Sequence, residues 1–277
     1  MMVAMDIKGL PFAKGHGTGN DFVIVPDPDG ELNLPADLVV ALCDRRRGLG
    51  ADGLLRVVRT GAHPEVAGRA AEAEWFMDYR NADGSLAEMC GNGVRVFARY
   101  LVEAGLAFGG TVPILTRAGR VVAEIGEDTI AVDMPLPEVF AGSVARVSGV
   151  DFPGTVATCG NPNLVCRVAD PDAVDLDRAP HLDPATFPAG ANVEFVAPVS
   201  ALHVRMRVVE RGVGETLSCG SGACAVAAVV LRDAALDVGT VTVDVPGGRL
   251  TVMLDTGRCV LSGPAVIVAA GTVRSAL

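Results

Sequence analysis

What the sequence lacks already narrows the class of protein. No apolar run approaches the roughly 18 residues that a membrane span needs, and Asp6 and Lys8 interrupt the apolar N-terminal stretch, so we expect no signal peptide. Positive charge is scarce as well: the formal charge is −10 and the pI is near 4.9. This balance argues against nucleic acid and anionic membranes as partners. Only two lysines accompany 21 arginines, which we attribute to genome bias.

Metal and disulfide patterns are also missing. The seven cysteines are odd in number and contain no Cys-x-x-Cys pair, which argues against a disulfide framework or a structural zinc site. We therefore expect a reducing, cytoplasmic location. The four histidines lack metal-ligand spacing, so we predict no metal site. At 277 residues, half of them apolar, the chain can form one large domain or two ordinary ones.

One four-residue pattern occurs twice, as Cys90-Gly91-Asn92-Gly93 and as Cys219-Gly220-Ser221-Gly222. Each copy leads into an apolar, helix-forming stretch. A thiol at a helix start lies at the positive end of the helix dipole, which is expected to lower its pKa, and the free N–H groups there bind anions. If the two copies face each other, they form a pocket for a small carboxylate with an ionisable thiol on either side.

The two motifs lie within a longer internal duplication. Four further blocks recur in the same order: Gly19–Val23 with Gly160–Val165, Gly50–Leu54 with Gly190–Glu194, Met77 with Met206, and Ala118–Val122 with Gly247–Thr251. The offset is 141 or 140 residues at first and 129 later, so we interpret 61–72 as a loop inserted in the first half. Two homologous halves are predicted, residues 1–137 and 138–265.

Each half is predicted to be α+β, a curved mixed sheet wrapped around a central helix. The helix after Cys90 carries an apolar stripe, with Arg95 and Arg99 off that stripe. The stretch 223–231 is apolar on every side, which predicts a fully buried helix. Short β-rich segments predict the strands at 22–25, 75–80, 120–125 and 129–134, and at 164–168, 202–210, 249–254 and 259–262.

A pair of opposed thiols can invert a stereocentre without a cofactor. One thiolate removes a proton from a carbon acid, and the opposite thiol returns a proton to the other face. The other five cysteines are interpreted as small buried hydrophobes. The glycine-rich stretch Gly15–Gly19 is a weak phosphate-loop signal, because a strand and not a helix follows it.

At these residues the chain resembles diaminopimelate epimerases, nearly from end to end. The motifs that carry the resemblance are His16–Phe22, Gly48–Gly53, Asn81–Ser85, Met89–Gly93, Gly160–Pro162, Asn192, Glu210–Gly212, Gly214–Thr216 and Cys219–Gly222. Together they are highly specific. Proline and hydroxyproline epimerases share the two cysteines but usually differ after the first and before the second.

The resemblance implies two pseudo-symmetric halves with the active site in the cleft between them, and a final segment, 266–277, that returns to the first half. It implies PLP-independent inversion of LL-diaminopimelate to the meso form for lysine and peptidoglycan synthesis. Cys90 and Cys219 are then the two bases. By the same resemblance, the reacting carboxylate is held by Gly91, Asn92, Gly220 and Ser221. The ammonium groups and the distal carboxylate are recognised by Asn20, Asn81, Asn161, Asn192, Glu210 and Arg211.

One position departs from the family pattern. Asn163 stands where the family usually has a histidine that assists the thiols. Asparagine can form hydrogen bonds but cannot accept a proton, so Glu210 and the helix dipoles must suffice, or the enzyme is slow or has another substrate. We expect the chemistry to be retained, at a reduced rate.

Three alternatives stay open from the residues alone. The first is a racemase of the same fold for another amino acid, such as histidine or hydroxyproline. The second is a thiol redox protein, which the 129-residue spacing of the two motifs disfavours. The third is an inactive carboxylate-binding module. The expected partner is a small amino acid with two carboxylates, and a homodimer is left open.

Overall fold

The computed structural model describes residues 8–274, which form two compact units. Unit 1 contains the described residues up to Val132 together with those from Ala265 onward, and unit 2 is Asp133–Pro264. Residues 1–7 and the last three residues of the expected returning segment, 275–277, lie outside the described part. The assignment of 1–137 and 138–265 to two homologous halves stays a prediction.

Unit 1 is built mainly from strands, with two α-helices. In chain order its elements are β1 (Pro11–Gly17), β2 (Asn20–Pro26), α1 (Ala36–Cys43), β3 (Gly53–Arg59), β4 (Trp75–Asn81), α2 (Gly91–Glu103), β5 (Gly110–Thr116), β6 (Gly119–Ile125), β7 (Ile130–Met134, which extends into unit 2) and β18 (Val266–Thr272). Two short 3₁₀ turns, Thr60–Ala62 and Ala67–Arg69, lie in and beside the segment interpreted as an inserted loop.

Unit 2 has the same character with one α-helix. Its elements are β8 (Glu138–Val147), β9 (Val150–Cys159), β10 (Asn161–Arg167), a 3₁₀ turn (Pro171–Ala173), β11 (His181–Leu182), β12 (Asn192–Ser200), β13 (His203–Glu210), β14 (Gly214–Thr216), α3 (Gly220–Asp233), β15 (Gly239–Val245), β16 (Gly248–Asp255) and β17 (Arg258–Gly263). Every strand expected from the sequence is present, with ends that differ from the expected ones by up to three residues.

The strand ladders repeat between the units. In unit 1 the order β18-β1-β2-β3-β4-β5-β6-β7 is antiparallel at every step except β2–β3 and β4–β5, which are parallel. In unit 2 the order β8-β9-β10-β12-β13-β15-β16-β17 is parallel only at β10–β12 and β13–β15. The parallel steps therefore occupy the same two places, and the two-halved α+β fold is confirmed.

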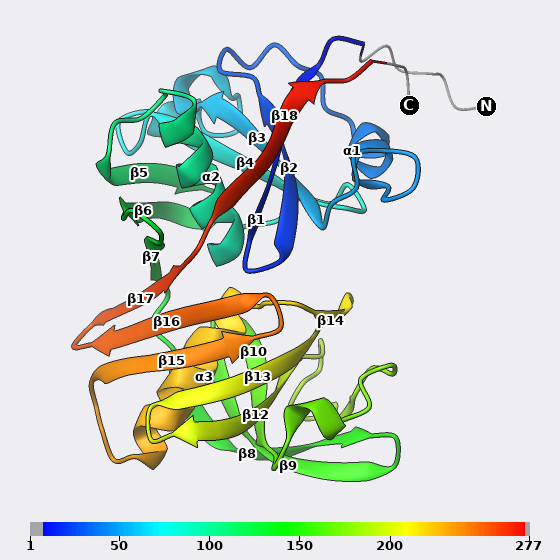
Figure 1. Cartoon of the computed structure of the whole chain (residues 1–277), viewed down its shortest axis with the longest axis vertical. Helices are drawn as coiled ribbons and strands as arrows, with labels where there is room; N and C mark the ends of the chain where they lie inside the picture. Colours follow the sequence, from blue (N-terminus) through cyan, green and yellow to red (C-terminus); the bar gives the residue numbers. More distant parts are fainter. Residues whose placement is uncertain (1–7, 275–277) are drawn as a thin grey trace. The chain divides into compact units, whose positions relative to one another are not determined.

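Figure 1 shows β18 beside β1, so the C-terminal strand completes the sheet of unit 1 at the place that β8 holds in unit 2. Parallel neighbours need a crossover connection, and in each unit the second crossover is a long helix. Helix α2 connects β4 to β5, and α3 connects β13 to β15. Both helices begin directly after a motif cysteine.

The glycine-rich stretch Gly15–Gly19 belongs to a hairpin. Gly17 pairs with Asn20, so Thr18 and Gly19 form a two-residue turn between β1 and β2. Both residues have positive φ, 49° and 83°, as a type I′ turn requires. The turn positions Asn20 at the start of β2.

Burial agrees with the apolar pattern of both helices. Residues 223–231 of α3 are all buried, as the sequence predicts. Helix α2 buries Val94, Phe97 and Leu101. Arg95 lies off that stripe in the pattern but is also buried, and it donates to Thr18 Oγ1 at 3.2 Å and to Asn92 Oδ1 at 3.0 Å.

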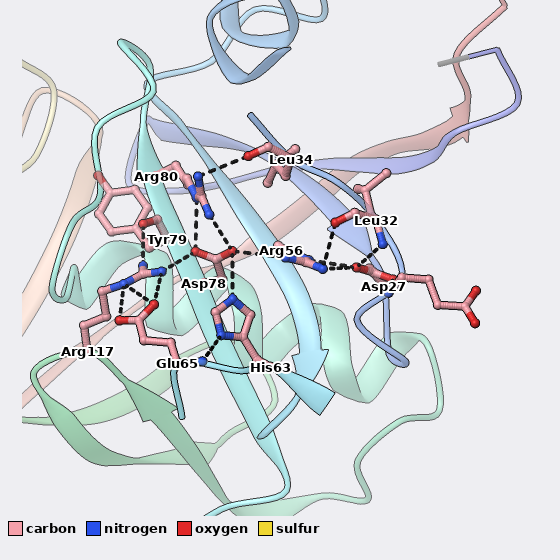
Figure 2. Close-up of polar contacts among 11 residues, drawn as sticks. Asp27, Leu32, Leu34, Arg56, His63, Glu65, Asp78, Tyr79, Arg80 and Arg117 are labelled. Carbon is pink, nitrogen blue, oxygen red and sulfur yellow. Dashed lines mark hydrogen bonds and ion pairs between the residues drawn. The ribbon is translucent and has the colours of Figure 1, made fainter. Parts of the chain in front are cut away.

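A buried ion cluster holds the segment 61–72 on the sheet of unit 1 (Figure 2). Asp78 on β4 is fully buried and accepts from Arg117 Nη2 at 2.7 Å and from Arg80 Nε at 3.2 Å. Two side chains of the segment 61–72 belong to the cluster. His63 Nε2 lies 3.7 Å from Asp78 Oδ2, and Glu65 forms an ion pair with Arg117 at 2.9 Å. Burial alone would raise the pKa of Asp78, but the hydrogen bonds from the two arginines lower it below its usual value. Asp78 is therefore a buried anion whose charge is fully paired.

Candidate active site

Cys90 caps the N-terminus of α2. Its backbone is extended, the helix begins at Gly91, and its Sγ accepts a hydrogen bond from Gly93 N at 3.4 Å. A side chain that accepts from a first-turn N–H is what fixes a helix start. The Sγ also lies 3.7 Å from Asn20 Oδ1, and Asn92 Nδ2 donates to that oxygen at 3.3 Å. Three residues expected at the site are thus in contact within unit 1.

Asn20 is held in turn by an ion cluster on the neighbouring loop. Its Nδ2 donates to Asp52 Oδ2 at 2.8 Å. Arg45 bridges Asp52 and Asp21, each at 2.7 Å. The amide of Asn20 therefore has its donor side tied down and its oxygen directed at Cys90 and Asn92.

Asn81 lies on the other side of β3. Its backbone pairs with Gly53, next to Asp52, and its Nδ2 donates to Ser85 Oγ at 3.0 Å. This contact belongs to the turn formed by Asp83, Gly84 and Ser85. Asn81 at the end of β4 and Asn20 at the start of β2 therefore lie at the same end of their strands, and the side chain of Asn81 is hydrogen-bonded to Ser85.

Cys219 caps α3 in the same way. Its Sγ accepts from Gly222 N at 3.4 Å, which is the distance found at Cys90. Ser221 Oγ lies at 3.5 Å from the sulfur, and Asn192 Nδ2 lies at 3.8 Å. Cys219 is 5% exposed, whereas Cys90 is half-buried. The two caps have equal geometry and unequal burial.

The expected pKa shift is wrong for Cys219. Burial raises the pKa of its thiol well above the usual value, and the carboxyls of Glu210 and Glu194 act in the same direction. The hydrogen bonds from Ser221 and the Gly222 amide act against this and do not offset it. A helix terminus stabilises a nearby thiolate by up to about 2 kcal/mol, which corresponds to about 1.5 pKa units. Full burial shifts a pKa by up to about 3–5 units in the opposite direction. Desolvation therefore outweighs the helix dipole here.

A chain of amides connects Asn163 to Cys219. Asn163 Nδ2 donates to the backbone oxygen of Asn161 at 2.7 Å, and Asn192 Nδ2 donates to Asn163 Oδ1 at 3.2 Å. The oxygen of Asn192 accepts from the backbone N of Arg211 at 3.0 Å. Asn163 thus orients Asn192, which is the amide that contacts the Cys219 sulfur.

Glu210 ends β13 near the same helix start, and Arg211 follows it. Thr216 Oγ1 donates to Glu210 Oε1 at 2.5 Å, and this bond fixes the carboxyl. Arg211 is exposed, and its Nη1 donates to Ala189 O at 3.4 Å. An exposed guanidinium is suited to a ligand carboxylate, because it can bind two carboxylate oxygens in parallel.

Sequence reasoning missed one ionisable group at Cys219. Glu194 on β12 is fully buried and raises the pKa of both Cys219 and Cys166. The available signal is a lone carboxyl within the apolar run Val193–Val196, two residues after Asn192 and so on the same strand face.

Two negative findings concern residues 8–274 only. No group of three or more His, Cys, Asp or Glu side chains in that range is placed to hold a metal ion. Of the helices in the described part of the chain, none combines the length and apolar character that a membrane crossing requires.

Comparison with known proteins decides the family. The model of the family described as diaminopimelate epimerase matches residues 12–139 and 155–268. The chain belongs to the diaminopimelate epimerase family. It is 56% identical to a diaminopimelate epimerase of Thermobifida fusca over 271 residues, 96% of this chain and 98% of the relative. It is 53% identical to one of Streptomyces coelicolor over 278 residues, 96% of each chain.

Solved structures of lower identity share the fold of this family member. A PhzF-family phenazine biosynthesis protein of Bacillus anthracis matches with a TM-score of 0.70 at 20% identity, over 96% of this chain and 99% of that one. A hydroxyproline epimerase of Agrobacterium vitis matches with a TM-score of 0.65 at 16% identity, over 96% and 91%. These likenesses support the fold alone.

Proposed function

We propose that the protein inverts one α-carbon of LL-2,6-diaminopimelate to give the meso form, without a cofactor, using Cys90 and Cys219 as the two bases. The observation that carries the proposal is the matched pair of cysteine caps, each accepting from the N–H three residues on at 3.4 Å. Family membership supports the substrate.

Each turnover moves two protons. The thiolate of one cysteine takes the α-proton, which leaves a carbanion conjugated with the carboxylate. The thiol of the other cysteine then gives its proton to the opposite face of that carbon. At the end, the sulfur that began as the thiolate carries a proton and the sulfur that began as the thiol is a thiolate. The number of protons on the enzyme and its overall charge are therefore unchanged.

The helix starts stabilise the negative charge that develops on the carboxylate. The first N–H groups of an α-helix have no intrahelical acceptor, and they lie at the positive end of the helix dipole. We assign the reacting carboxylate to the N–H groups of Gly91, Asn92, Gly220 and Ser221. Preorganised donors of this kind typically lower a barrier by about 3–4 kcal/mol each.

The distal end of the substrate carries an ammonium group and a second carboxylate. We assign its recognition to Arg211 for the carboxylate, and to amides and one carboxyl for the ammonium groups: Asn20, Asn81, Asn161, Asn192 and Glu210. A site with a fixed guanidinium leaves that charge unpaired when the substrate lacks a second carboxylate, which disfavours proline-like substrates.

Asn163 acts through Asn192 in this proposal. The hydrogen bond between the two amides orients the group that contacts Cys219. An asparagine cannot take a proton from the thiol, so we expect Asn163→His to raise turnover. Unchanged or lower turnover in a folded Asn163→His variant contradicts the view that this position limits the rate.

The test is incubation with LL-diaminopimelate in D2O, followed by NMR of the α-proton. We expect loss of the α-proton signal and formation of the meso isomer. L-histidine and trans-4-hydroxy-L-proline in parallel samples test the alternative substrates. Absence of both deuterium uptake and meso product with LL-diaminopimelate refutes the proposal. We place the reaction in the cytoplasm, in lysine and peptidoglycan synthesis, and leave a homodimer open.

A further inference from the structure

Glu194 is a fully buried carboxyl that has no hydrogen-bond partner for either oxygen among residues 8–274. It lies on β12, paired with Val165 on one side and with Val208 on the other. Burial raises the pKa of Glu194 well above its usual value, the nearby Glu210 adds to the rise, and its own backbone amide opposes it only weakly. An unpaired buried carboxylate is costly, so the protonated acid is the favoured form.

The carboxyl lies directly behind the first turn of α3. A Cβ added to Gly222 would come within 2.5 Å of Glu194 Oε1. Gly222 is also the residue whose N–H binds the Cys219 sulfur, at 3.4 Å. Asn192, two residues before Glu194 on the same face of β12, approaches that sulfur at 3.8 Å. Only one glycine therefore separates Glu194 from the cap of Cys219.

Unit 1 shows that packing alone does not require a carboxyl at this place. Gly93 matches Gly222, because each is the third residue after its motif cysteine. A Cβ added to Gly93 would meet Leu55 Cδ2 at 3.5 Å. Leu55 is fully buried and pairs with Ile24 in the parallel ladder of β2 and β3, as Glu194 pairs with Val165 between β10 and β12. Where unit 1 has an apolar side chain, unit 2 has an acid.

A carboxyl beside a thiol is expected to lose its proton before the thiol does. A carboxyl is a stronger acid than a thiol by about four pKa units, and two anions in a buried space repel each other. The first proton that this pair loses therefore leaves Glu194 and not Cys219. The other ionisable groups that face Glu194 are Glu210 on β13 and Cys166 on β10. Burial, with a smaller contribution from Glu194, raises the pKa of Cys166 to about 12, so this thiol stays neutral.

We propose that Glu194 is a positioning residue that keeps Cys219 in its thiol form in the resting enzyme, so that Cys90 provides the thiolate that takes the first proton. The part that concerns Cys90 rests on the two-thiol function proposed above. The part that concerns Cys219 depends only on unit 2. Glu194 acts through Cys219 and touches neither the substrate nor the reacting carbon.

The test follows the ionisation of Cys219 by NMR in full-length protein labelled with ¹³C at cysteine Cβ. The Cys219 resonance is assigned by its loss in Cys219→Ser. Glu194→Gln keeps the shape of the acid but cannot ionise, and Glu194→Leu introduces the side chain that unit 1 has. We expect the midpoint of the Cys219 titration to fall by about one pH unit or more in both variants. Leu55→Met, an apolar exchange at the matched place in unit 1, serves as the control and should leave this midpoint unchanged.

An unchanged Cys219 midpoint in the folded Glu194 variants overturns the inference. If one of the two variants fails to fold, as judged by circular dichroism, the other decides. Epimerase activity is measured on the same samples. A lowered midpoint in a protein that does not epimerise diaminopimelate refutes the proposed function and leaves the role of Glu194 in place. An unchanged midpoint in an active enzyme does the reverse.

Discussion

Cys90 and Cys219 have the same local geometry and different surroundings. Each caps a central helix, and each accepts the third N–H after it at 3.4 Å. Behind the first turn, however, unit 1 places Leu55 and unit 2 places Glu194. The difference teaches that the shared cap positions both sulfurs, whereas the strand behind the helix decides whether an apolar side chain or an acid lies behind the cap.

The largest effect is expected from removing either thiol. Proton transfer by a positioned group contributes about 10²–10⁴-fold, so Cys90→Ala and Cys219→Ala should each lower kcat by that factor. Steady-state assays with LL-diaminopimelate measure it, and Cys43→Ala, at a buried cysteine of α1, is the control. If either cap variant keeps more than a tenth of the activity, the two cysteines do not share the chemistry as described.

The next effect compares the fully buried carboxyl of each unit. Asp78 is an anion paired with arginines, and Glu194 has no partner in the described residues. Asp78→Asn leaves buried arginines without their anion and should lower the free energy of unfolding by about 3–5 kcal/mol. Glu194→Gln removes a carboxyl that must take up a proton on folding at pH 7, so this variant should not lower the free energy of unfolding. Urea unfolding of both variants at pH 7 measures this, and equal losses contradict the assignment of opposite charge states.

Glu194→Leu should stabilise the protein, and the gain should depend on pH. Because the folded-state pKa of Glu194 lies above its unfolded value of about 4.5, its stability contribution is fully present below that value and is lost as pH rises toward the folded pKa. The pH-dependent part of the gain should therefore be absent below about pH 4. Toward neutral pH the gain should grow by about 1.4 kcal/mol for each pH unit until the folded pKa of Glu194 is reached. Unfolding measured from pH 4 to pH 9 that shows a gain independent of pH argues against a raised pKa.

The smallest effect distinguishes the two matched glycines. An added Cβ at Gly93 meets Leu55 in ordinary contact, whereas at Gly222 it comes within 2.5 Å of the Glu194 carboxyl. We expect Gly93→Ala to be nearly neutral and Gly222→Ala to cost about 1 kcal/mol in unfolding free energy. Combining Gly222→Ala with Glu194→Ala should remove most of that cost. A cost that persists in the double variant would place its origin elsewhere in the helix.

The two-halved fold can be predicted from the sequence because short motifs recur in the same order in both halves of the chain. The two cysteine motifs predict both caps, and the all-apolar stretch 223–231 predicts the buried helix α3. Helix α1 carries no comparable signal, since Pro35 precedes a short apolar run without a capping side chain. Buried Arg95 is missed because helical periodicity places it off the apolar stripe, and only its contacts with Thr18 and Asn92 explain its position.

Electrostatics at the site is less accessible from the sequence. A helix-start thiol is expected to be acidic from local structure, yet desolvation at Cys219 depends on strands that are distant in the chain. The duplicated block Gly50–Leu54 with Gly190–Glu194 aligns Glu194 with Leu54. The ladders and the glycine contacts align it instead with Leu55. A shift of one residue reverses the face of a strand, so the alignment of motifs alone cannot show which side chain lies behind the helix.

The central claim is that one thiolate and one thiol act on opposite faces of the substrate. Initial-rate incubation of LL-diaminopimelate in D2O tests it most directly, with the deuterium content of product and remaining substrate measured separately by mass spectrometry. A two-thiol enzyme takes the proton on one sulfur and delivers a solvent deuteron from the other. We therefore predict one deuterium at the inverted carbon of the first meso product and none in the remaining LL substrate. Deuterium appearing in the remaining substrate as fast as in the product would show that a single base serves both faces, and would contradict the account.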